Sequence, residues 1–223
     1  MDNNFSLIEY YRRRAPEYES IYNKLDLEIQ KENQETVEML KKYLNGRKVI
    51  EVACGTGYWT QFLSATAKEI TATDINKEVL DIAKQKTYHC PVSFQIMDAY
   101  RLAFKDKRFN AGLANFWFSH IPKKEINHFL SEFHRVLQSG SRVFLTDNHH
   151  SHLSDSLGKL ITKKGDNNTY KLRQLTDGSE YLVLKNYYTI KELVEIFSNH
   201  ITGFSELNVH FGQYFWRVLY EID

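Results

Sequence analysis

Residues 50–60 read IEVACGTGYWT, and this stretch decides what kind of fold the chain forms. β-branched residues fill the run before the glycines and predict a buried strand over residues 48–54. Glycines at the exit of a strand, here Gly55 and Gly57, let the backbone turn sharply or let a ligand approach it closely. A helical pattern follows over residues 57–67. The stretch therefore predicts a strand, a turn and a helix, with the turn as a candidate ligand site.

The composition of the chain indicates a single soluble domain. Its 223 residues are 42% hydrophobic, which is enough to bury a full core. Lys and Arg number 29 against 28 Asp and Glu, so charge gives no general reason to bind nucleic acid or an anionic membrane. The two cysteines, Cys54 and Cys90, are far apart, which argues against a zinc or disulfide framework. No apolar run has the length of a signal peptide or a membrane span. We expect a cytoplasmic protein.

Four further strand patterns alternate with helical ones along the chain. The first of them ends on Asp74, and Asn76 behind it is a residue type that caps helices. The clearest helix runs from Pro122, which suits a first turn, to Gly140, which suits a C-terminal stop. This alternation predicts an α/β fold in which helices cover both faces of a parallel sheet. The four strands are expected at residues 69–75, 92–98, 109–116 and 141–148.

The C-terminal third has the pattern of antiparallel strands. Residues 170–188 predict a β-hairpin around the turn at Asp177 and Gly178. Thr189 and Glu192 have the spacing of a capping box, which predicts a short helix after the hairpin. Two final strands are expected to pair with each other at residues 205–211 and 214–222.

The glycine turn follows the first strand, and ligands of open α/β sheets bind at the carboxyl ends of the strands. A dinucleotide fingerprint would need a third glycine at position 60, which is occupied by Thr60. A P-loop would need Lys followed by Ser or Thr after the glycines, and the sequence lacks this pair. Both classes of phosphate-binding site are therefore disfavoured.

The same stretch resembles the first motif of the class I S-adenosylmethionine (SAM)-dependent methyltransferases, an acidic residue followed by a glycine-rich turn. In that family, the acidic residue that Asp74 matches accepts hydrogen bonds from both ribose hydroxyls. A carboxylate suits this contact because it offers paired acceptors. The resemblance also implies that Asp98 and Ala99 contact adenine and that Asn115 and Phe116 lie beside the methionine moiety. The full set of expected cofactor residues in these motifs is Glu51, Ala53, Cys54, Gly55, Gly57, Asp74, Ile75, Asp98, Ala99, Asn115 and Phe116.

A closer resemblance extends over nearly the whole chain. The segments YYRRRAPEYE, GTGYWT, SHIP and YKLRQLTDG through VLKNYYT are similar to a bacterial small-molecule branch of the family, represented by the phosphonate O-methyltransferase of dehydrophos biosynthesis. It implies a Rossmann-like fold with a seven-stranded, mostly parallel sheet, a C-terminal antiparallel hairpin, an N-terminal helical lid and an added substrate-covering β-hairpin. One domain then spans 1–223, with the lid and first helices in 1–45, the SAM-binding core in 46–148 and the hairpin with the last strands in 149–223.

The N-terminal segment carries aromatic and cationic residues at helical spacings, which more often serve packing than ligand binding. Pro16 is expected to divide the segment into two helices. In the family that the chain resembles, a segment before the first strand closes over SAM, and aromatic rings attract a sulfonium by cation–π contact. The expected lid contacts are Tyr11, Arg14, Tyr18 and Tyr22.

Three residues are candidates for the chemistry. Arg173 and Lys185 lie in apolar hairpin strands, and counting by alternate positions suggests that they share a face. They either clamp an anionic substrate or lie on a solvated face. His120, after the fourth strand, either orients or deprotonates a substrate or packs at a helix entry.

We therefore expect an enzyme that moves the methyl group of SAM to a small molecule, at an oxygen of a phosphonate or carboxylate, and releases S-adenosylhomocysteine (SAH). Alternatives are an N-methyltransferase, a phenol O-methyltransferase, or a SAM-binding regulator without catalysis. Nucleic-acid methylation is disfavoured because residues 115–118 read NFWF and lack the Asn/Asp-Pro-Pro-aromatic tetrapeptide. No metal is expected, since adjacent histidines such as His149 and His150 rarely share an ion on an irregular loop. The protein is expected to be a monomer or a homodimer.

Overall fold

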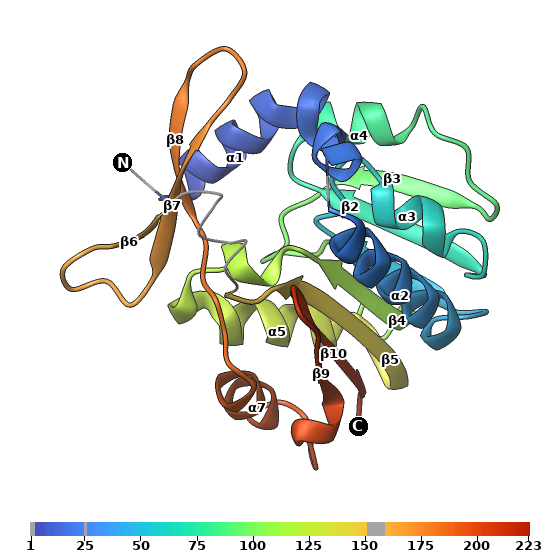
Figure 1. The fold of residues 1–223 in the computed structure, drawn as a ribbon. Coiled ribbons are helices and arrows are strands. Elements are labelled where there is room, and N and C mark those ends of the chain that lie inside the picture. The colour runs from blue at the N-terminus through green and yellow to red at the C-terminus, as the bar shows by residue number, and fades with distance from the viewer. Residues whose placement is uncertain (1–2, 25, 151–158) are drawn as a thin grey trace.

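The computed structural model describes the backbone of residues 3–24, 26–150 and 159–223, and the side chains of 7–20, 26–150 and 159–223. A seven-stranded sheet with helices on both faces forms the body of the molecule. A separate three-stranded sheet stands at one side, next to the N-terminal helix (Figure 1).

The main sheet has the strand order β3-β2-β1-β4-β5-β10-β9. The strands from β3 to β5 are parallel, whereas β10 pairs antiparallel with both β5 and β9. The predicted seven-stranded, mostly parallel sheet with a final antiparallel pair is thus confirmed. The strands are β1 (Lys48–Val52), β2 (Glu69–Asp74), β3 (Val92–Ile96), β4 (Phe109–Asn115), β5 (Leu137–Asn148), β9 (Val209–Phe211) and β10 (Phe215–Glu221).

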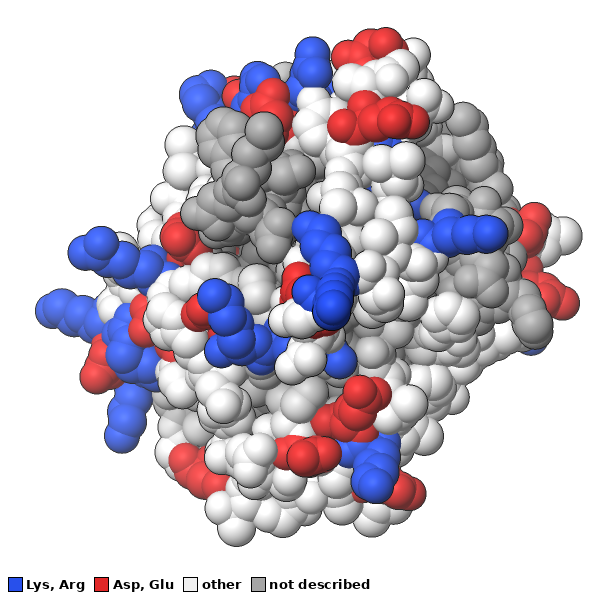
Figure 2. Space-filling model, turned by 90° about the vertical axis from the view of Figure 1, so that its left-hand side faces the viewer, with Lys and Arg blue, Asp and Glu red and all other residues white. Residues whose placement is uncertain are grey.

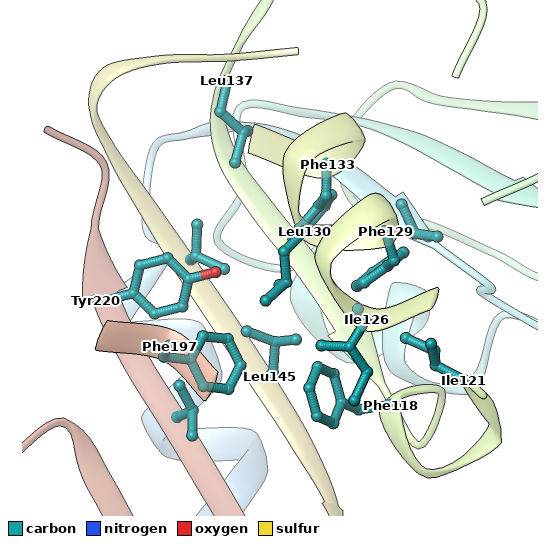
Figure 3. Close-up of a cluster of buried hydrophobic side chains, with 14 of the residues drawn as sticks. Phe118, Ile121, Ile126, Phe129, Leu130, Phe133, Leu137, Leu145, Phe197 and Tyr220 are labelled. Atoms are coloured by element: carbon teal, nitrogen blue, oxygen red, sulfur yellow. The ribbon is translucent and has the colours of Figure 1, made fainter. Parts of the chain in front are cut away.

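Alternate residues of each central strand pack on opposite faces of this sheet. In β1, Val49 faces a cluster with α2 and α3, whereas Ile50 and Val52 face a second cluster with α5 and α7. Figure 3 shows this second cluster, in which Phe129 and Phe133 of α5 lie over the sheet. Burial on both faces explains the nearly continuous apolar runs of the parallel strands. The covering helices are α2 (Leu27–Tyr43), α3 (Tyr58–Leu63), α4 (Lys77–Ala83), α5 (Ile126–Arg135) and α7 (Ile190–Ser198).

The N-terminal segment forms two consecutive helices, α1 (Asn3–Arg14) and the 3-10 helix η1 (Ala15–Lys24). The change of helix type falls at Pro16, as the sequence predicts, because proline lacks an N–H and clashes with the preceding turn of an α-helix. α1 lies along β8 of the small sheet, and η1 continues toward α4 (Figure 1). This segment therefore links the small sheet to the carboxyl ends of the main strands.

The small sheet has the strand order β6 (Leu160–Thr162), β7 (Thr169–Gln174) and β8 (Glu180–Leu184). Its β7–β8 hairpin turns at Gly178, which has φ +83°, as the Asp-Gly pair predicts. Strand β6 was not anticipated from the sequence. Lys171 of β7 is paired with Val183 of β8, and Val183 packs against Leu7 and Tyr10 of α1. The face that carries Lys171 and Arg173 is consequently turned toward α1 and the body.

The predicted helix over residues 122–140 is too long. One 3-10 turn, η3 (Lys123–Glu125), precedes α5, and the helix ends at Arg135. Strand β5 already begins at Leu137, which pairs with Phe109 before a bulge in the ladder. The apolar residues happen to keep a helical spacing into this strand. The spacing alone therefore predicted an end of the helix that lies too far along the chain. Gly140 lies inside β5 with φ +73° and does not stop the helix.

Candidate functional site

The carboxyl ends of β1 to β4 and the N-terminal helices enclose a pocket of about 810 Å³, measured to its open mouth. This is the place where ligands bind in open α/β sheets. Its walls come from α1, η1, the glycine loop and the residues after β2, β3 and β4. They are Leu7, Ile8, Tyr11, Tyr18, Ala53, Gly55, Thr56, Asp74, Ile75, Asn76, Val79, Met97, Asp98, Ala99, Tyr100, Asn115, Phe116 and Trp117.

The glycine loop winds with positive φ at alternate residues, +53° at Ala53, +56° at Gly55 and +77° at Gly57. The two glycines serve different purposes. A Cβ at Gly55 would meet no atom within 4 Å, so this residue opens onto the pocket. A Cβ at Gly57 would lie 2.6 Å from the Tyr88 hydroxyl oxygen and 3.0 Å from the Ala83 Cβ, so this residue lets the start of α3 pack closely against the end of α4. Gly55 therefore allows a close approach by a ligand, whereas Gly57 allows a sharp turn with close packing.

Asp74 fixes the floor of the pocket. Its carboxylate accepts hydrogen bonds from the backbone N–H of Gly55 at 3.0 Å and of Asn76 at 2.9 Å. Burial raises the pKa of Asp74 to about 6, although these backbone donors act in the opposite direction. The carboxylate thus holds the glycine loop and also faces the pocket, where it can accept hydrogen bonds from a ligand.

Glu51 and Cys54 lie behind the loop and are not among the residues that line the pocket. Thr60, which stands where a dinucleotide site has its third glycine, donates to a Glu51 oxygen at 2.7 Å. Burial raises the pKa of Glu51 to about 8, so the side chain is mostly protonated at neutral pH. Glu51 accordingly supports the loop from below. Gly57, likewise predicted as a cofactor contact, packs against α4 and the nearby Tyr88.

The end of β4 offers polar atoms without protein partners. Asn115 is buried, and neither its amide nitrogen nor its amide oxygen has a hydrogen-bond partner among the described residues. The same holds for the indole nitrogen of Trp117. Between them, Phe116 takes φ +55° and stacks on Trp59 at 5.6 Å between ring centroids. Buried polar groups are normally paired, so these atoms fit a polar ligand in the pocket.

The opposite end of the pocket is formed after β2 and β3. Asp98 accepts a hydrogen bond from the backbone N–H of Tyr100 at 2.9 Å, which fixes the turn there. Ala99 is buried beside it, and Ile75 is partly exposed on the neighbouring strand end. All three predicted residues line the pocket, together with Tyr100, which the sequence analysis did not select.

The N-terminal helices close one side of the pocket. Tyr11 and Tyr18 line it, with their ring centroids 6.1 Å apart. Arg14 lies outside the lining, and its guanidinium stacks over Tyr18 at 5.0 Å from the ring centroid. The side chain of Tyr22 lies outside the described residues. Two of the four predicted lid contacts therefore face the pocket.

A polar contact ties η1 to the cofactor loop. Glu19 accepts a hydrogen bond from the Thr56 hydroxyl at 2.5 Å and pairs with the ammonium group of Lys86 after α4. Thr56 lines the pocket, so this contact joins the lid to the pocket wall. The sequence analysis missed it because the partners are 37 residues apart.

His120 is buried between three elements. One ring nitrogen, Nδ1, lies 2.7 Å from the Leu184 carbonyl oxygen, to which it must donate, and Nε2 lies 2.8 Å from the Tyr11 hydroxyl. Burial and the nearby Lys185 lower the pKa of His120 to about 3. Because both nitrogens are engaged and the ring is a weak base, these surroundings do not suit the predicted deprotonation of a substrate. They suit a link between α1, η2 (Phe118–His120) and β8.

Lys185 is buried, and its ammonium group has three hydrogen-bond partners. It lies 2.7 Å from the Ser119 hydroxyl, 3.0 Å from an Asp147 carboxylate oxygen and 2.9 Å from the Asn148 amide oxygen. An ammonium group has three donors, so all of them are used. Arg173 lies on the same face of the hairpin, as predicted, and is partly buried. Its charge acts on both Tyr11 and His120, although Arg173 itself is not among the residues that line the pocket.

Two properties of the described residues bear on other classes of function. They hold no group of three or more His, Cys, Asp or Glu side chains able to bind a metal ion. The Nε2 atom of His149 is instead 2.9 Å from the Gly212 carbonyl oxygen. No helix within the described ranges has the length and apolarity required to cross a bilayer.

The fold and the pocket together define a class of protein. Residues 49–140 match the family described as "Methyltransferase domain". Demethylmenaquinone methyltransferase of Staphylococcus epidermidis is 28% identical over 138 residues, 60% of this chain and 56% of that protein. The same enzyme of Staphylococcus aureus is 28% identical over 137 residues. The match spans little more than half the length of these curated relatives. Residues 49–140 therefore match a methyltransferase domain.

Solved structures extend this similarity to the whole chain. A structure described as a complex of DhpI with SAH has a TM-score of 0.73 at 22% identity, covering 97% of this chain and 96% of its own. DhpI with SAM and HEP gives a TM-score of 0.75 at 23% identity, covering 96% of each chain. PH0226 of Pyrococcus horikoshii gives 0.69 at 20% identity, covering 89% and 92%. The predicted Rossmann-like methyltransferase fold is confirmed.

SAM is the cofactor of this class, and the pocket fits it. Asp74 presents a carboxylate, with paired acceptor oxygens, to the pocket, and Gly55 leaves the loop open to a close approach. The unpartnered amide of Asn115 lies at the opposite end of the cavity. These observations give the pocket the donors and acceptors that an adenosyl amino acid requires.

Proposed function

We propose that this protein transfers the methyl group of SAM to an oxygen of a small anionic molecule. The observation that carries this proposal is the face of the β7–β8 hairpin with Arg173, which is turned toward α1, the helix whose Leu7, Ile8 and Tyr11 line the pocket. Arg173 on this face acts electrostatically on Tyr11 and His120. A substrate between this face and Asn115 would lie between a cation and the cofactor site.

Bound SAM supplies an electrophilic methyl group, and the protein's task is to align the acceptor oxygen with it. Tyr11 and Tyr18 form the wall on the lid side, where their rings exclude water and favour a sulfonium by cation–π contact. Asp74 holds the ribose end, and Asp98 with Ala99 the adenine end. Asn115 and Phe116 would hold the methionine moiety, through the unpartnered amide of Asn115.

An anionic acceptor needs no general base. A phosphonate or carboxylate oxygen is already deprotonated at neutral pH, which agrees with the low basicity of His120. Under this proposal His120 positions Tyr11. Its Nε2 accepts a hydrogen bond from the Tyr11 hydroxyl, while its Nδ1–H donates a hydrogen bond to the Leu184 carbonyl oxygen. Arg173 contacts the substrate anion, and a guanidinium can do so with two parallel N–H donors.

Lys185 has a different part in this proposal. Its ion pair with Asp147 ties the end of β8 to the end of β5, and its bond to Ser119 ties both to η2. It thereby holds the hairpin over the pocket. Truncating Lys185 would leave Asp147 buried without its partner, at a cost of about 3–5 kcal/mol.

A substrate panel tests the proposed function. SAH release is measured for phosphonates, carboxylates, phenols and amines of similar size, each offered with SAM. We expect turnover of the anionic oxygen acceptors and a rise in KM of about tenfold or more for Arg173→Ala, with SAM affinity unchanged. Turnover of amines or neutral phenols alone would contradict the anionic acceptor. SAM binding without turnover of any compound would favour a regulatory SAM-binding protein.

A further inference from the structure

Helix α1 is shared between the pocket and the β7–β8 hairpin, and it lies along β8 in Figure 1. Its residues Leu7, Ile8 and Tyr11 line the pocket. Leu7 and Tyr10 also belong to a buried cluster with Val183, which is 2% exposed and comes from β8. One helix therefore forms both a wall of the cofactor pocket and a support of the hairpin.

Polar contacts reinforce this cluster toward the turn of the hairpin. The Arg13 guanidinium donates a hydrogen bond to the Tyr181 hydroxyl at 2.8 Å, and it lies 3.6 Å from an Asp177 carboxylate oxygen. The ring of Tyr10 packs against that of Tyr181, with 5.6 Å between the centroids. Because Tyr181 lies in β8 and Asp177 in the turn, α1 holds the end of the hairpin that carries its turn.

The other end of the hairpin is attached to the main body. Lys185, the residue after β8, pairs with Asp147 of β5 at 3.0 Å. The backbone N–H of Asn186 donates a hydrogen bond to the Ser119 carbonyl oxygen at 2.8 Å. These bonds do not involve α1, whereas the contacts at the turn end are made with it. Movement of α1 would therefore release the turn end of the hairpin while the base stays attached.

We propose that α1 couples the cofactor pocket to the hairpin, so that a cofactor bound in the pocket also stabilises the turn end of the β7–β8 hairpin. The ligand adds contacts to the residues of α1 that line the pocket, and it raises the free energy needed to detach this helix. Because the hairpin is held by the same helix, opening of the two together becomes rarer. The coupling does not depend on which acceptor is methylated. Under the proposed function, SAM binding prepares the hairpin for the acceptor, and acceptor binding must strengthen SAM binding in return.

Amide hydrogen exchange of the hairpin tests the coupling without any acceptor. SAH is the probe, added at about 100 times its dissociation constant, where an opening that requires an empty pocket slows by up to about 100-fold. We expect exchange in residues 172–183 to slow by at least about threefold, and exchange in α7, which follows the hairpin in the chain, to stay as it was. Unchanged exchange in residues 172–183 would overturn the inference, and so would equal slowing of α7.

Val183→Ala tests whether the effect passes through α1. Truncation of this side chain loosens its packing against Leu7 and Tyr10, so the hairpin opens more often without α1. The slowing caused by SAH in residues 172–183 should then fall to about a third of the parental factor or less, with each variant saturated relative to its own dissociation constant. The matched control is Leu182→Ala, the neighbouring position of β8 on the opposite face, which should keep the full slowing. Equal responses of the two variants would contradict a coupling through α1.

A second pair of variants lies on the surface and keeps the inference testable if Val183→Ala does not fold. Arg13→Gln removes the contacts with the hairpin, whereas Arg12→Gln removes bonds to Glu9 of α1 itself, at 2.7 Å and 2.6 Å. Exposed ion pairs are weak, so Arg13→Gln should lower the slowing caused by SAH by only about two- to threefold. Arg12→Gln should leave it unchanged, and equal effects of the two would contradict the coupling. If no acceptor is methylated, the proposed function fails, and the exchange measurement still decides whether α1 couples pocket and hairpin.

Discussion

At the scale of single residues, two carboxyl groups at the pocket have pKa values that the fold raises. Asp74 faces the ligand, whereas Glu51 lies behind the loop, and burial raises the pKa of each. Ionised Asp74 offers acceptors on both oxygens, but its protonated form turns one oxygen into a donor. A protonation event on the protein is thereby linked to binding of the cofactor.

We therefore predict that SAM binding weakens as pH falls through about 6, the pKa of Asp74 in the empty pocket. If only the ionised form binds the ribose diol, affinity at pH 5 should be about tenfold lower than at pH 7.5. Titration calorimetry at the two pH values measures the change. Asp74→Asn should bind SAM about tenfold or more weakly at pH 7.5 and lose the dependence on this pKa. A wild-type affinity that is the same at both pH values would contradict a ribose contact.

Glu51 leads to a prediction about stability. Its pKa is raised from 4.5 in the unfolded chain to about 8, so the folded state holds an extra proton between these values. The resulting stabilisation is complete below about 4.5 and is lost as pH rises through about 8. Urea unfolding at pH 7 and pH 8 should show the free energy of unfolding declining by up to ~1.4 kcal/mol per pH unit from this group.

Glu51→Gln mimics the protonated side chain and should remove this part of the decline. Glu195→Gln, an exposed change on α7, serves as the control and should keep it. The window from pH 7 to pH 8 avoids Asp74 and His120, whose pKa values are about 6 and about 3. A decline in Glu51→Gln as steep as in the parent would mean that Glu51 is ionised in the folded protein.

At the scale of elements, α1 and η1 are held by a few polar contacts. Tyr11 bonds to His120, and Glu19 bonds to Thr56 and pairs with Lys86. These contacts all border the pocket, so the lid and the cofactor share the same surroundings. A ligand that fills the pocket adds contacts to Leu7, Tyr11 and Tyr18 and should stabilise both helices.

We predict that amide hydrogen exchange in residues 8–20 slows when SAH is added. Protection should rise because opening of the lid would then break ligand contacts as well as the existing polar ones. The amides of α7, on the far side of the sheet, provide an internal control and should exchange as before. Unchanged protection of residues 8–20 at saturating SAH would identify them as a fixed strut.

A second element-scale contact joins α2 to the last hairpin. Glu32 of α2 accepts hydrogen bonds from the backbone N–H groups of residues 213–215 and pairs with Arg217 at 3.2 Å. The side chain is only 9% exposed, so few water molecules could replace it. One carboxylate thereby accepts hydrogen bonds from three consecutive backbone N–H groups at the turn between β9 and β10.

Glu32→Ala should destabilise the protein by about 3–5 kcal/mol, because it removes the carboxylate that pairs with the buried Arg217 and accepts from three backbone N–H groups. Glu28→Ala is the matched control, one turn earlier on the same helix. Glu28 accepts from the exposed Tyr214 hydroxyl at 2.9 Å, and its loss should cost less than about 1 kcal/mol. Thermal and urea unfolding measure both. Equal effects of the two substitutions would refute a special role for Glu32.

At the scale of the whole molecule, local patterns in the sequence were enough to predict the main sheet. Strands buried on both faces leave continuous apolar runs, and the glycine turn marks the first of them. The predicted end of α5 was wrong because Leu137, which has a helical spacing in the sequence, pairs with Phe109 in the sheet. The three-residue strand β6 is too short to leave a pattern.

The site was predicted where it follows strand ends and missed where it depends on distant partners. Asp74, Asp98 and Asn115 each follow or end a strand, so topology alone brings them to one pocket. The Tyr11–His120 bond joins residues 109 positions apart, and the Lys185–Asp147 pair joins residues 38 apart. No spacing rule anticipates such contacts.

The strands of the small sheet form an excursion of the chain between β5 and α7 of the main body. Lys185, at the end of this excursion, bonds to Asn148, the last residue of β5. Under the proposed function, the acceptor is recognised by this excursion and the cofactor mainly by residues that precede it in the sequence. Selection can rework residues 149–188 while the SAM site, encoded earlier, stays intact. Exchange of residues 149–188 between homologous enzymes should accordingly transfer the acceptor preference to the recipient and leave its SAM affinity unchanged. For an enzyme lineage, such a layout makes new substrates accessible through local recombination.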